Sequence, residues 1–377
     1  MTRRIPFNRP LRTGGEPERV AAAIERGWTG GNGPASEACQ ALLRGLTGTA
    51  VVLLTHSCTG ALEMSALLAE VGPGDEAIMP SFTFASTANA FVLRGATPVF
   101  VDVDPDTLNV DPQRVADAIT LQTRVIVAMH YGGIGCDMDA LGVLAREHGL
   151  LLVEDAAQGV GAALDGRALG AIGDVGTLSF HETKNISCGE GGALLVNDAR
   201  LAERAEILQE KGTDRQRFAR GEVSHYTWVD VGSSFVMSDV VAALLSEQLE
   251  RVAEVTAARL AIWDAYHAAF EPLEQAGVVR RPVVPAGAQH NAHLYRLMLP
   301  DRAARDALIA RLAADGISAY FHYVPLHSAP AGRRFGRVHG PIDVTEAAAG
   351  TLVRLPLWVG LDDDDVARVA QGVAAAT

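Results

Sequence analysis

The sequence has few cysteines and no CxxC pair. Its 377 residues include four cysteines, Cys39, Cys58, Cys136 and Cys188, which lie far apart along the chain. In a chain of this length, such isolated cysteines indicate reduced thiols in a cytoplasmic protein and argue against a structural zinc site.

Long apolar runs are also missing. No stretch approaches the roughly 18 apolar residues that a membrane-spanning helix needs, and the basic start of the chain is not followed by the apolar core of a signal peptide. We therefore expect a soluble, cytoplasmic protein with no membrane partner. The apolar fraction of 48% excludes a disordered chain and is sufficient for more than one compact domain.

Positive charge is in deficit. Lysine and arginine number 32 against 45 aspartates and glutamates, which leaves a formal net charge of −13. A protein of this charge does not attract nucleic acid through its overall field. An anionic ligand must therefore be held by local donors.

Short apolar runs alternate with amphipathic stretches between about residues 50 and 197. This alternation of strands and helices, with continuous Val, Ile and Leu in the strands, predicts an α/β fold with a mainly parallel sheet covered on both faces. The expected strands are 50–55, 76–80, 97–103, 124–130, 150–154, 173–180 and 192–197.

The rest of the chain has a different pattern. Residues 238–270 show helical spacing, and after Gly277 short strands (292–299 and 317–321) and helices (302–315 and 363–375) predict a small α+β unit. We place the boundary within the long helix, so that residues 1–255 form a large domain and residues 256–377 a small C-terminal domain.

Three polar segments follow predicted strands, at the edge where open α/β sheets bind ligands. The first contains Ser57, Cys58 and Thr59, whose hydroxyls, backbone N–H groups and helix start are typical of an anion site. An ordinary helix N-cap explains the same residues equally well.

The second segment places Asp155 directly after a buried strand. A carboxylate in this position can keep a heterocyclic nitrogen protonated, because the anion favours the cationic form. The alternative is an aspartate that caps the next turn.

The third segment is Ser179-Phe-His-Glu-Thr-Lys184-Asn, followed by Gly189-Glu-Gly-Gly. A lysine between two core strands is unusual, since lysine prefers open surface. Burial would lower its pKa and make the neutral amine available for covalent catalysis. Taken alone, a surface lysine remains the better explanation.

The order of the three segments matches a pyridoxal-phosphate (PLP) site. Together with Pro80-Ser-Phe-Thr-Phe84-Ala-Ser-Thr and Glu154-Asp-Ala-Ala-Gln158-Gly, they make the whole chain resemble the DegT/DnrJ/StrS family of PLP-dependent sugar aminotransferases, a branch of the fold type I, aspartate-aminotransferase-like enzymes. The segments 179–185, 210–215, 226–228, 232–234 and 290–293 resemble most closely the TDP-4-keto-6-deoxyglucose 4-aminotransferases, the TDP-4-amino-4,6-dideoxygalactose transaminase group.

The resemblance implies roles for individual residues. Lys184 would bind PLP covalently and move the proton, while Asp155 would pair with the pyridine nitrogen. Gln158 would bond near the ring hydroxyl, and Phe84 would stack on the ring unless it is simply core packing. The implied phosphate contacts are Ser57, Cys58, Thr59 and Ser179.

The resemblance also implies a homodimer with its sites at the interface. Many family members have Gly-x-Asn-x-Arg where this chain has Gly232-Ser-Ser234-Phe-Val, and that asparagine reaches the neighbouring subunit's cofactor phosphate. Ser234 has a shorter side chain that can donate similarly, so its role is the open point of the resemblance.

Further residues are candidates for substrate contacts. Arg215, Arg217 and Arg220 form an Arg-rich segment that could meet a sugar-nucleotide pyrophosphate or could be a solvated charge run. Trp28 and Thr29 match a segment bordering the family's sugar pocket. His181, His293, Tyr323 and His327 are polar or aromatic candidates. His290 and His293 lack a third metal ligand, so we expect no metal.

The expected activity is transfer of an amino group from L-glutamate to C4 of TDP-4-keto-6-deoxyglucose, giving a TDP-4-amino-4,6-dideoxyhexose. The alternatives are a 3-keto aminotransferase or one that uses another nucleotide, a PLP-dependent dehydratase, and a regulatory protein that keeps the fold. Lys184 argues against the dehydratase, whose relatives have histidine there, and intact Lys184 and Asp155 argue against the regulator.

Overall fold

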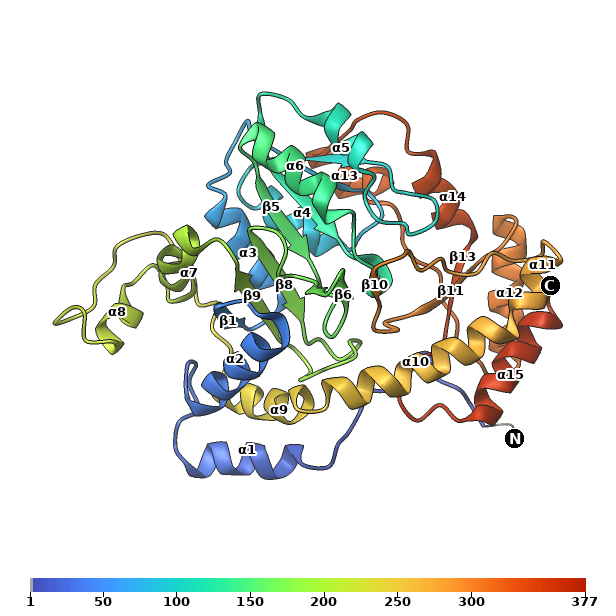
Figure 1. The fold of residues 1–377 in the computed structure, drawn as a ribbon, viewed down its shortest axis with the longest axis horizontal. Helices are drawn as coiled ribbons and strands as arrows, with labels where there is room; N and C mark the ends of the chain where they lie inside the picture. Colours follow the sequence, from blue (N-terminus) through green and yellow to red (C-terminus); the bar gives the residue numbers. More distant parts are fainter. Residues whose placement is uncertain (1–2) are drawn as a thin grey trace.

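The computed structural model describes residues 3–377. At its centre lies one sheet with the strand order β1-β9-β8-β5-β4-β2-β3-β12 (Figure 1). The strands are β1 (Val51–Thr55), β9 (Gly192–Val196), β8 (Val175–Ser179), β5 (Leu151–Asp155), β4 (Thr123–Met129), β2 (Glu76–Pro80), β3 (Thr97–Val101) and β12 (Arg337–Val338). Neighbouring strands from β8 to β12 are parallel, and β9 runs antiparallel to both of its neighbours, β1 and β8. The expected α/β fold with a mostly parallel sheet is confirmed.

Helices cover both faces of this sheet because successive strand residues point to opposite sides. In β2, Ala77 and Met79 pack on one face with α3 (Cys58–Leu68), α4 (Ala85–Val92) and α7 (Ala202–Gln209). Ile78 packs on the other face with α5 (Pro112–Ala118) and α6 (Met138–His148).

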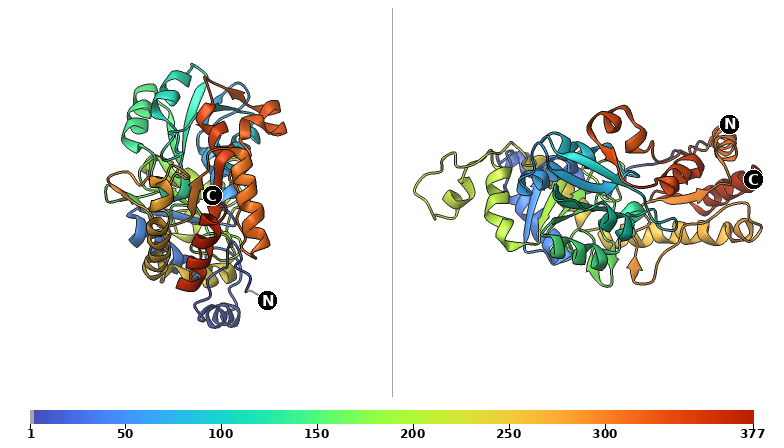
Figure 2. Two further views of the ribbon diagram at one scale, coloured as in Figure 1. Left: turned by 90° about the vertical axis from the view of Figure 1, so that its right-hand side faces the viewer. Right: turned by 90° about the horizontal axis from the view of Figure 1, so that it is seen from above.

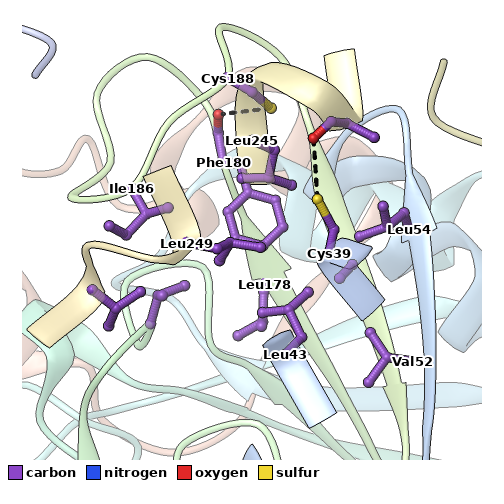
Figure 3. Close-up of a cluster of buried hydrophobic side chains, with 14 of the residues drawn as sticks. Cys39, Leu43, Val52, Leu54, Leu178, Phe180, Ile186, Cys188, Leu245 and Leu249 are labelled. Carbon is purple, nitrogen blue, oxygen red and sulfur yellow. Dashed lines mark hydrogen bonds between the residues drawn. The ribbon is translucent and has the colours of Figure 1, made fainter. Parts of the chain in front are cut away.

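The second face continues beneath β1, β9 and β8. There α1 (Glu16–Glu25), α2 (Pro34–Thr47) and α9 (Asp239–Leu249) enclose an apolar cluster that contains Phe180, Cys39 and Cys188 (Figure 3). The thiol of Cys39 donates to the carbonyl of Ala242 at 3.1 Å. All four cysteines are free thiols.

The C-terminal part builds a second cluster. The two-stranded sheet of β11 (Tyr295–Met298) and β13 (Leu352–Leu355) packs with α10 (Val252–Ala269), α12 (Arg302–Ala314) and α15 (Asp363–Ala374). The remaining α-helices and strands are α8 (Arg215–Ala219), α11 (Glu271–Gln275), α13 (Pro330–Phe335), α14 (Asp343–Thr351) and the short strands β6 (Ala163–Leu164), β7 (Arg167–Ala168) and β10 (Ala288–Gln289). No helix among the described residues is both long and apolar enough to cross a membrane.

The expected long helix over 238–270 is two helices, since Glu250 and Arg251 form a turn between α9 and α10. Val255 still packs in the cluster around α9, whereas Ile262 belongs to the C-terminal cluster. The division near residue 255 stays a proposal. Ile5 is an exception, because it packs with the C-terminal cluster although it lies within residues 1–255.

The strand expected at 317–321 does not form. Ile317 makes a single bridge to Ile5, and Tyr320 makes another to Arg354. These two pairings are to different segments, so no continuous ladder can develop.

Viewed from above, α8 extends from one end of the molecule, and the C-terminal helix α15 lies at the other (Figure 2).

A buried carboxylate ties the loop before β8 to the sheet. Glu154 is fully buried and accepts from the backbone N–H groups of Gly170, Ile172 and Gly173 at 2.8, 2.6 and 2.6 Å. His130 donates to it from Nε2 at 2.9 Å, because its Nδ1 accepts from a backbone N–H. Every partner of Glu154 is therefore a donor.

Glu154→Gln should destabilise the protein. The amide nitrogen would face N–H donors whichever way the side chain is turned, and each lost bond to a charged acceptor contributes about 1.5–3 kcal/mol. We expect denaturant unfolding to show a loss of roughly 3 kcal/mol. The exposed control Glu147→Gln should unfold like the wild type. Equal stability of the two variants would contradict the network.

Candidate active site

A pocket of about 430 Å³ opens at the carboxyl ends of β5 and β8. Open α/β sheets bind ligands at this edge. The pocket is lined by eleven of the residues expected from the sequence: Ser57, Cys58, Thr59, Phe84, Asp155, Gln158, Ser179, His181, Lys184, His293 and Tyr323.

Lys184 lies in the hairpin that joins β8 to β9. The hairpin is held by backbone bonds between Phe180 and Gly191 and from the N–H of Glu182 to the carbonyl of Gly189, both 2.8 Å. Burial lowers the pKa of Lys184, although Cys58 and Asp155 act in the opposite direction. The hairpin thus presents to the pocket an amine that is easier to deprotonate than an ordinary lysine.

Asp155 ends β5 and is almost completely buried. Its Oδ2 accepts from the hydroxyl of Thr87 at 2.7 Å, and its Oδ1 accepts from the N–H of Ala157 at 3.2 Å. The hydroxyl of Thr83 lies 2.9 Å from that of Thr87. These contacts orient the carboxylate along the pocket wall and leave it capacity for a further donor.

The N-terminus of α3 forms another wall. Ser57 caps the helix by accepting from the N–H of Gly60 at 3.1 Å. The first N–H groups of a helix have no acceptor within it, so those of Cys58 and Thr59 are available to an anion. A Cβ on Gly192 would lie 2.4 Å from the nitrogen of Cys58, so only glycine lets β9 pass this close.

Two further walls come from Phe84 and Ser179. Phe84 precedes α4 and is 62% exposed, so it is not core packing, and its ring is free to cover a ligand. Ser179 ends β8 and is buried, and its Oγ accepts from the N–H of His181 at 3.4 Å. Burial also raises the pKa of the Cys58 thiol to about 12, which keeps it uncharged.

Aromatic side chains form the wall towards the C-terminal part. The amide of Gln158 donates to the hydroxyl of Tyr323 at 3.1 Å and accepts from the N–H of Gly132 at 2.7 Å. The hydroxyl of Tyr131 lies 3.2 Å from Nδ1 of His322. Burial raises the pKa of Tyr131 to about 12 and lowers that of His322, so both groups are neutral.

The two pocket histidines that the sequence predicted, His181 and His293, differ. His293 bonds Oδ1 of Asn185 through Nδ1 at 3.1 Å, and burial holds its pKa well below the ordinary value, so that it is a neutral donor. His181 is half-exposed and lies 3.6 Å from a carboxylate oxygen of Glu190. Both line the pocket.

Several expected residues lie outside this pocket. Trp28, Thr29 and Arg215 line a separate hollow of about 310 Å³ together with Lys211. Ser234 is exposed and lies beside Glu210, where their backbones form a bridge.

Other candidates are engaged elsewhere on the same chain. Arg217 pairs with Glu203 and Glu222 at 3.3 Å, and Arg220 pairs with Glu222 and Glu206 at 2.6 and 2.9 Å. His327 lies between the hydroxyl of Ser81 and the carboxylate of Glu346, at 2.8 and 2.9 Å. These partners hold the three side chains away from the pocket.

His290 packs against Trp263 with ring centroids 4.6 Å apart, whereas His293 faces the pocket. Within residues 3–377, no three or more histidine, cysteine, aspartate or glutamate side chains are arranged to hold a metal ion.

The structure adds pocket residues that sequence reasoning missed, among them Arg259, His322 and Arg354. Arg259 donates to the carbonyls of Ala292 and His293 at 3.1 and 2.9 Å, so it supports the pocket wall. These residues lie in helical or C-terminal segments without a motif, and no local pattern marks them.

The pocket fits PLP. The helix N-terminus offers donors for a phosphate, Asp155 offers a buried carboxylate for a ring nitrogen, and Lys184 offers the amine. Phe84 offers an exposed ring face for stacking.

Comparison with known proteins places the chain in a family. The model of the DegT/DnrJ/EryC1/StrS aminotransferase family matches residues 13–374. The spore coat polysaccharide biosynthesis protein SpsC of Bacillus subtilis is 33% identical, with 98% of this chain and 96% of SpsC covered.

Comparison with solved structures also identifies aminotransferases as similar proteins. The aminotransferase TlmJ of Streptoalloteichus hindustanus is 36% identical with a TM-score of 0.90, covering 99% of this chain and 98% of TlmJ. The PLP form of Spr1654 of Streptococcus pneumoniae, a proposed sugar aminotransferase, is 27% identical with a TM-score of 0.89, again with 99% and 98% covered. The expected fold type I architecture is confirmed by these likenesses. The chain belongs to the DegT/DnrJ/EryC1/StrS aminotransferase family.

Proposed function

We propose that the protein transfers an amino group from L-glutamate to C4 of TDP-4-keto-6-deoxyglucose with PLP as cofactor, giving a TDP-4-amino-4,6-dideoxyhexose. The observation that carries the proposal is the meeting of the Lys184 amine, the Asp155 carboxylate and the start of α3 in one pocket. The family supports sugar amino transfer, and the motifs quoted above support the particular sugar.

The residues that line the pocket have separate roles in the proposed amino transfer. PLP, when bound, supplies an electron-withdrawing ring that stabilises negative charge on the carbon losing its proton. The desolvated Lys184 amine can take up that proton and return it to a neighbouring atom. Asp155, oriented by Thr87, would hold the ring nitrogen protonated. The N–H groups of Cys58 and Thr59 would bind the phosphate.

We further propose a homodimer in which each subunit completes its partner's site. Trp28, Thr29, Lys211 and Arg215 line a hollow separate from the pocket, and α8 extends from the body of the molecule (Figure 1). A projecting cationic segment can reach the pyrophosphate of a sugar nucleotide bound at the neighbouring subunit. Ser234 is exposed, and its backbone pairs with that of Glu210, which lines the same hollow, so Ser234 would face a partner as well.

The decisive experiment is incubation of the purified protein with PLP, L-glutamate and TDP-4-keto-6-deoxyglucose, followed by NMR of the product. An amino group at C4 would support the proposal and reveal its configuration. Reaction with only a 3-keto sugar, or only with another nucleotide, would establish a different member of the family.

Lys184 should be the residue that binds PLP. The sequence contains just two lysines, Lys184 and Lys211, so borohydride reduction and peptide mapping give an unambiguous answer. Burial lowers the pKa of Lys184, whereas Lys211 is exposed. The pyridoxyl label should therefore appear on Lys184 and be retained in the control Lys211→Arg. A label on Lys211 would refute the assignment.

Asp155→Asn should retain PLP and slow the half-reaction with glutamate by orders of magnitude. The amide keeps the shape and the bond from Thr87 but removes the charge that favours the protonated ring nitrogen. Stopped-flow absorbance measures the rate. Thr87→Ser, which keeps the hydroxyl, serves as the control, and turnover of Asp155→Asn at the wild-type rate would contradict the role.

Arg215→Ala should weaken binding of the sugar nucleotide about tenfold or more, because a charge-assisted bond contributes about 1.5–3 kcal/mol. Glutamate carries no pyrophosphate, so its half-reaction should not change. Arg217→Ala and Arg220→Ala are matched controls, since carboxylates of the same chain already neutralise these arginines. An unchanged KM for the sugar nucleotide in Arg215→Ala would show that the segment is only a solvated loop.

A further inference from the structure

Thr83 is a buried residue between β2 and α4 that lies behind the wall of the active-site pocket. Its neighbours Phe84, Ser86 and Thr87 line the pocket, whereas Thr83 does not. The side chains of Thr83 and Thr87 are 1% and 0% exposed, and their hydroxyl oxygens lie 2.9 Å apart. Any effect of Thr83 on a bound molecule must therefore pass through Thr87.

The direction of the hydrogen bonds around Thr87 follows from its single hydroxyl proton. Thr87 donates this proton to Oδ2 of Asp155 at 2.7 Å, since an ionised carboxylate can only accept. The oxygen of Thr87 is then left as the acceptor of its second bond, so Thr83 must be the donor. The three side chains thus form a directed chain, from Thr83 to Thr87 to Asp155, that is buried along its whole length.

This chain reduces the basicity of the Asp155 carboxylate. Each hydroxyl in such a chain polarises the next one and strengthens the following bond by about 10–30%. A stronger bond from Thr87 stabilises the negative charge of Asp155 and lowers the affinity of the carboxylate for a proton. The other oxygen, Oδ1, accepts from the N–H of Ala157 at 3.2 Å, so donors hold both oxygens in their ionised form.

The charge of Asp155 also acts on the titratable groups that face it in the pocket, Lys184, Cys58 and Tyr323. Burial is the main cause of the pKa shift in each of them, and in each the charge of Asp155 raises the pKa. A change in where the proton of a bound ligand resides would therefore be felt at the reacting amine as well.

We propose that Thr83 is a positioning residue that keeps the proton shared between Asp155 and the PLP ring on the ring nitrogen, and that it acts through Thr87 alone. A more basic carboxylate would take up this proton and leave the ring neutral. The neutral ring withdraws fewer electrons and stabilises negative charge less well. The inference rests on PLP as the cofactor of the proposed function and adds a residue that no pocket contact reveals.

The test combines ¹⁵N NMR of PLP labelled at the ring nitrogen with the rate of the glutamate half-reaction, both measured on the full-length protein. Thr83→Val keeps the shape of the side chain and lacks the hydroxyl. We expect its ring-nitrogen resonance to move towards that of neutral pyridine, and kcat to fall about three- to tenfold with KM unchanged. Thr83→Ser restores the hydroxyl and should resemble the wild type in both measurements.

Thr345 offers a matched control. Its hydroxyl is also fully buried and donates to a buried carboxylate, that of Asp102, at 2.8 Å, but neither residue lines the pocket. Thr345→Val should lower the free energy of unfolding without changing the ring-nitrogen resonance or kcat. Equal effects of Thr83→Val and Thr345→Val on the resonance and on kcat would reduce Thr83 to a structural residue and overturn the inference.

A double variant tests whether Thr83 acts through Thr87. Thr87→Val removes the direct bond to Asp155 and should lower kcat about 10- to 100-fold. Adding Thr83→Val to Thr87→Val should then change neither the resonance nor kcat further, because the chain is already broken.

Three results would overturn the inference: a further loss in the double variant, a wild-type resonance in Thr83→Val, or a Thr83→Ser protein that behaves like Thr83→Val. Thr83→Ala, with a smaller side chain, provides the same comparison if Thr83→Val does not fold. A wild-type protein that binds no PLP would instead refute the proposed function itself.

Discussion

Desolvation of the Lys184 amine is the constraint on which the site depends. Lysine is rarely buried, because its ammonium form loses hydration. Here the antiparallel pair of β8 and β9 continues as hydrogen bonds from Phe180 to Gly191 and from Glu182 to Gly189, and this closes a hairpin that places Lys184 at the pocket. The parallel register of β5 with β8 puts Asp155 opposite Thr177, near the same edge. The stability of the fold as a whole thus compensates for the free-energy cost of desolvating Lys184. Such a cost is typical of catalytic groups.

The groups at this edge of the sheet also determine where an anionic ligand can bind. The chain carries a net charge of −13, so an anionic ligand depends on groups aimed at it rather than on the overall field. Two such groups line the pocket together with Lys184: the N–H groups at the start of α3 and the guanidinium of Arg354. A third concentration of cations, around Lys211 and Arg215, lies in a separate hollow.

Much of the fold could be predicted from the sequence because local signals and tertiary packing agree. The strands 76–80 and 150–154 have apolar runs that the sheet buries on both faces, and a helix over 138–148 begins with an Asp cap and ends before Gly149 in the left-handed conformation. The prediction of a strand at 317–321 was wrong because the backbone there makes only single bridges to distant segments. The bridges of Ile317 to Ile5 and of Tyr320 to Arg354 depend on distant segments, which no local pattern encodes.

The candidate site shows the same difference between local motifs and long-range contacts. Residues 155–158 and 179–184 follow strands and carry motifs, whereas Arg354 lies on β13, which pairs with the distant strand β11 and bridges Tyr320. The scarcity of lysine was a usable signal for Lys184, since only one other lysine competes with it.

The central claim is that the Lys184 amine moves the proton at the donor's α-carbon. Exchange of the α-hydrogen of L-glutamate for deuterium, followed by ¹H NMR in D₂O with PLP and no sugar acceptor, tests it most directly. The wild type should exchange this hydrogen at a rate well above the background. Lys184→Arg, which keeps a positive charge but cannot act as a base near neutral pH, should still bind PLP and show no exchange. Exchange at the wild-type rate in Lys184→Arg would contradict the account.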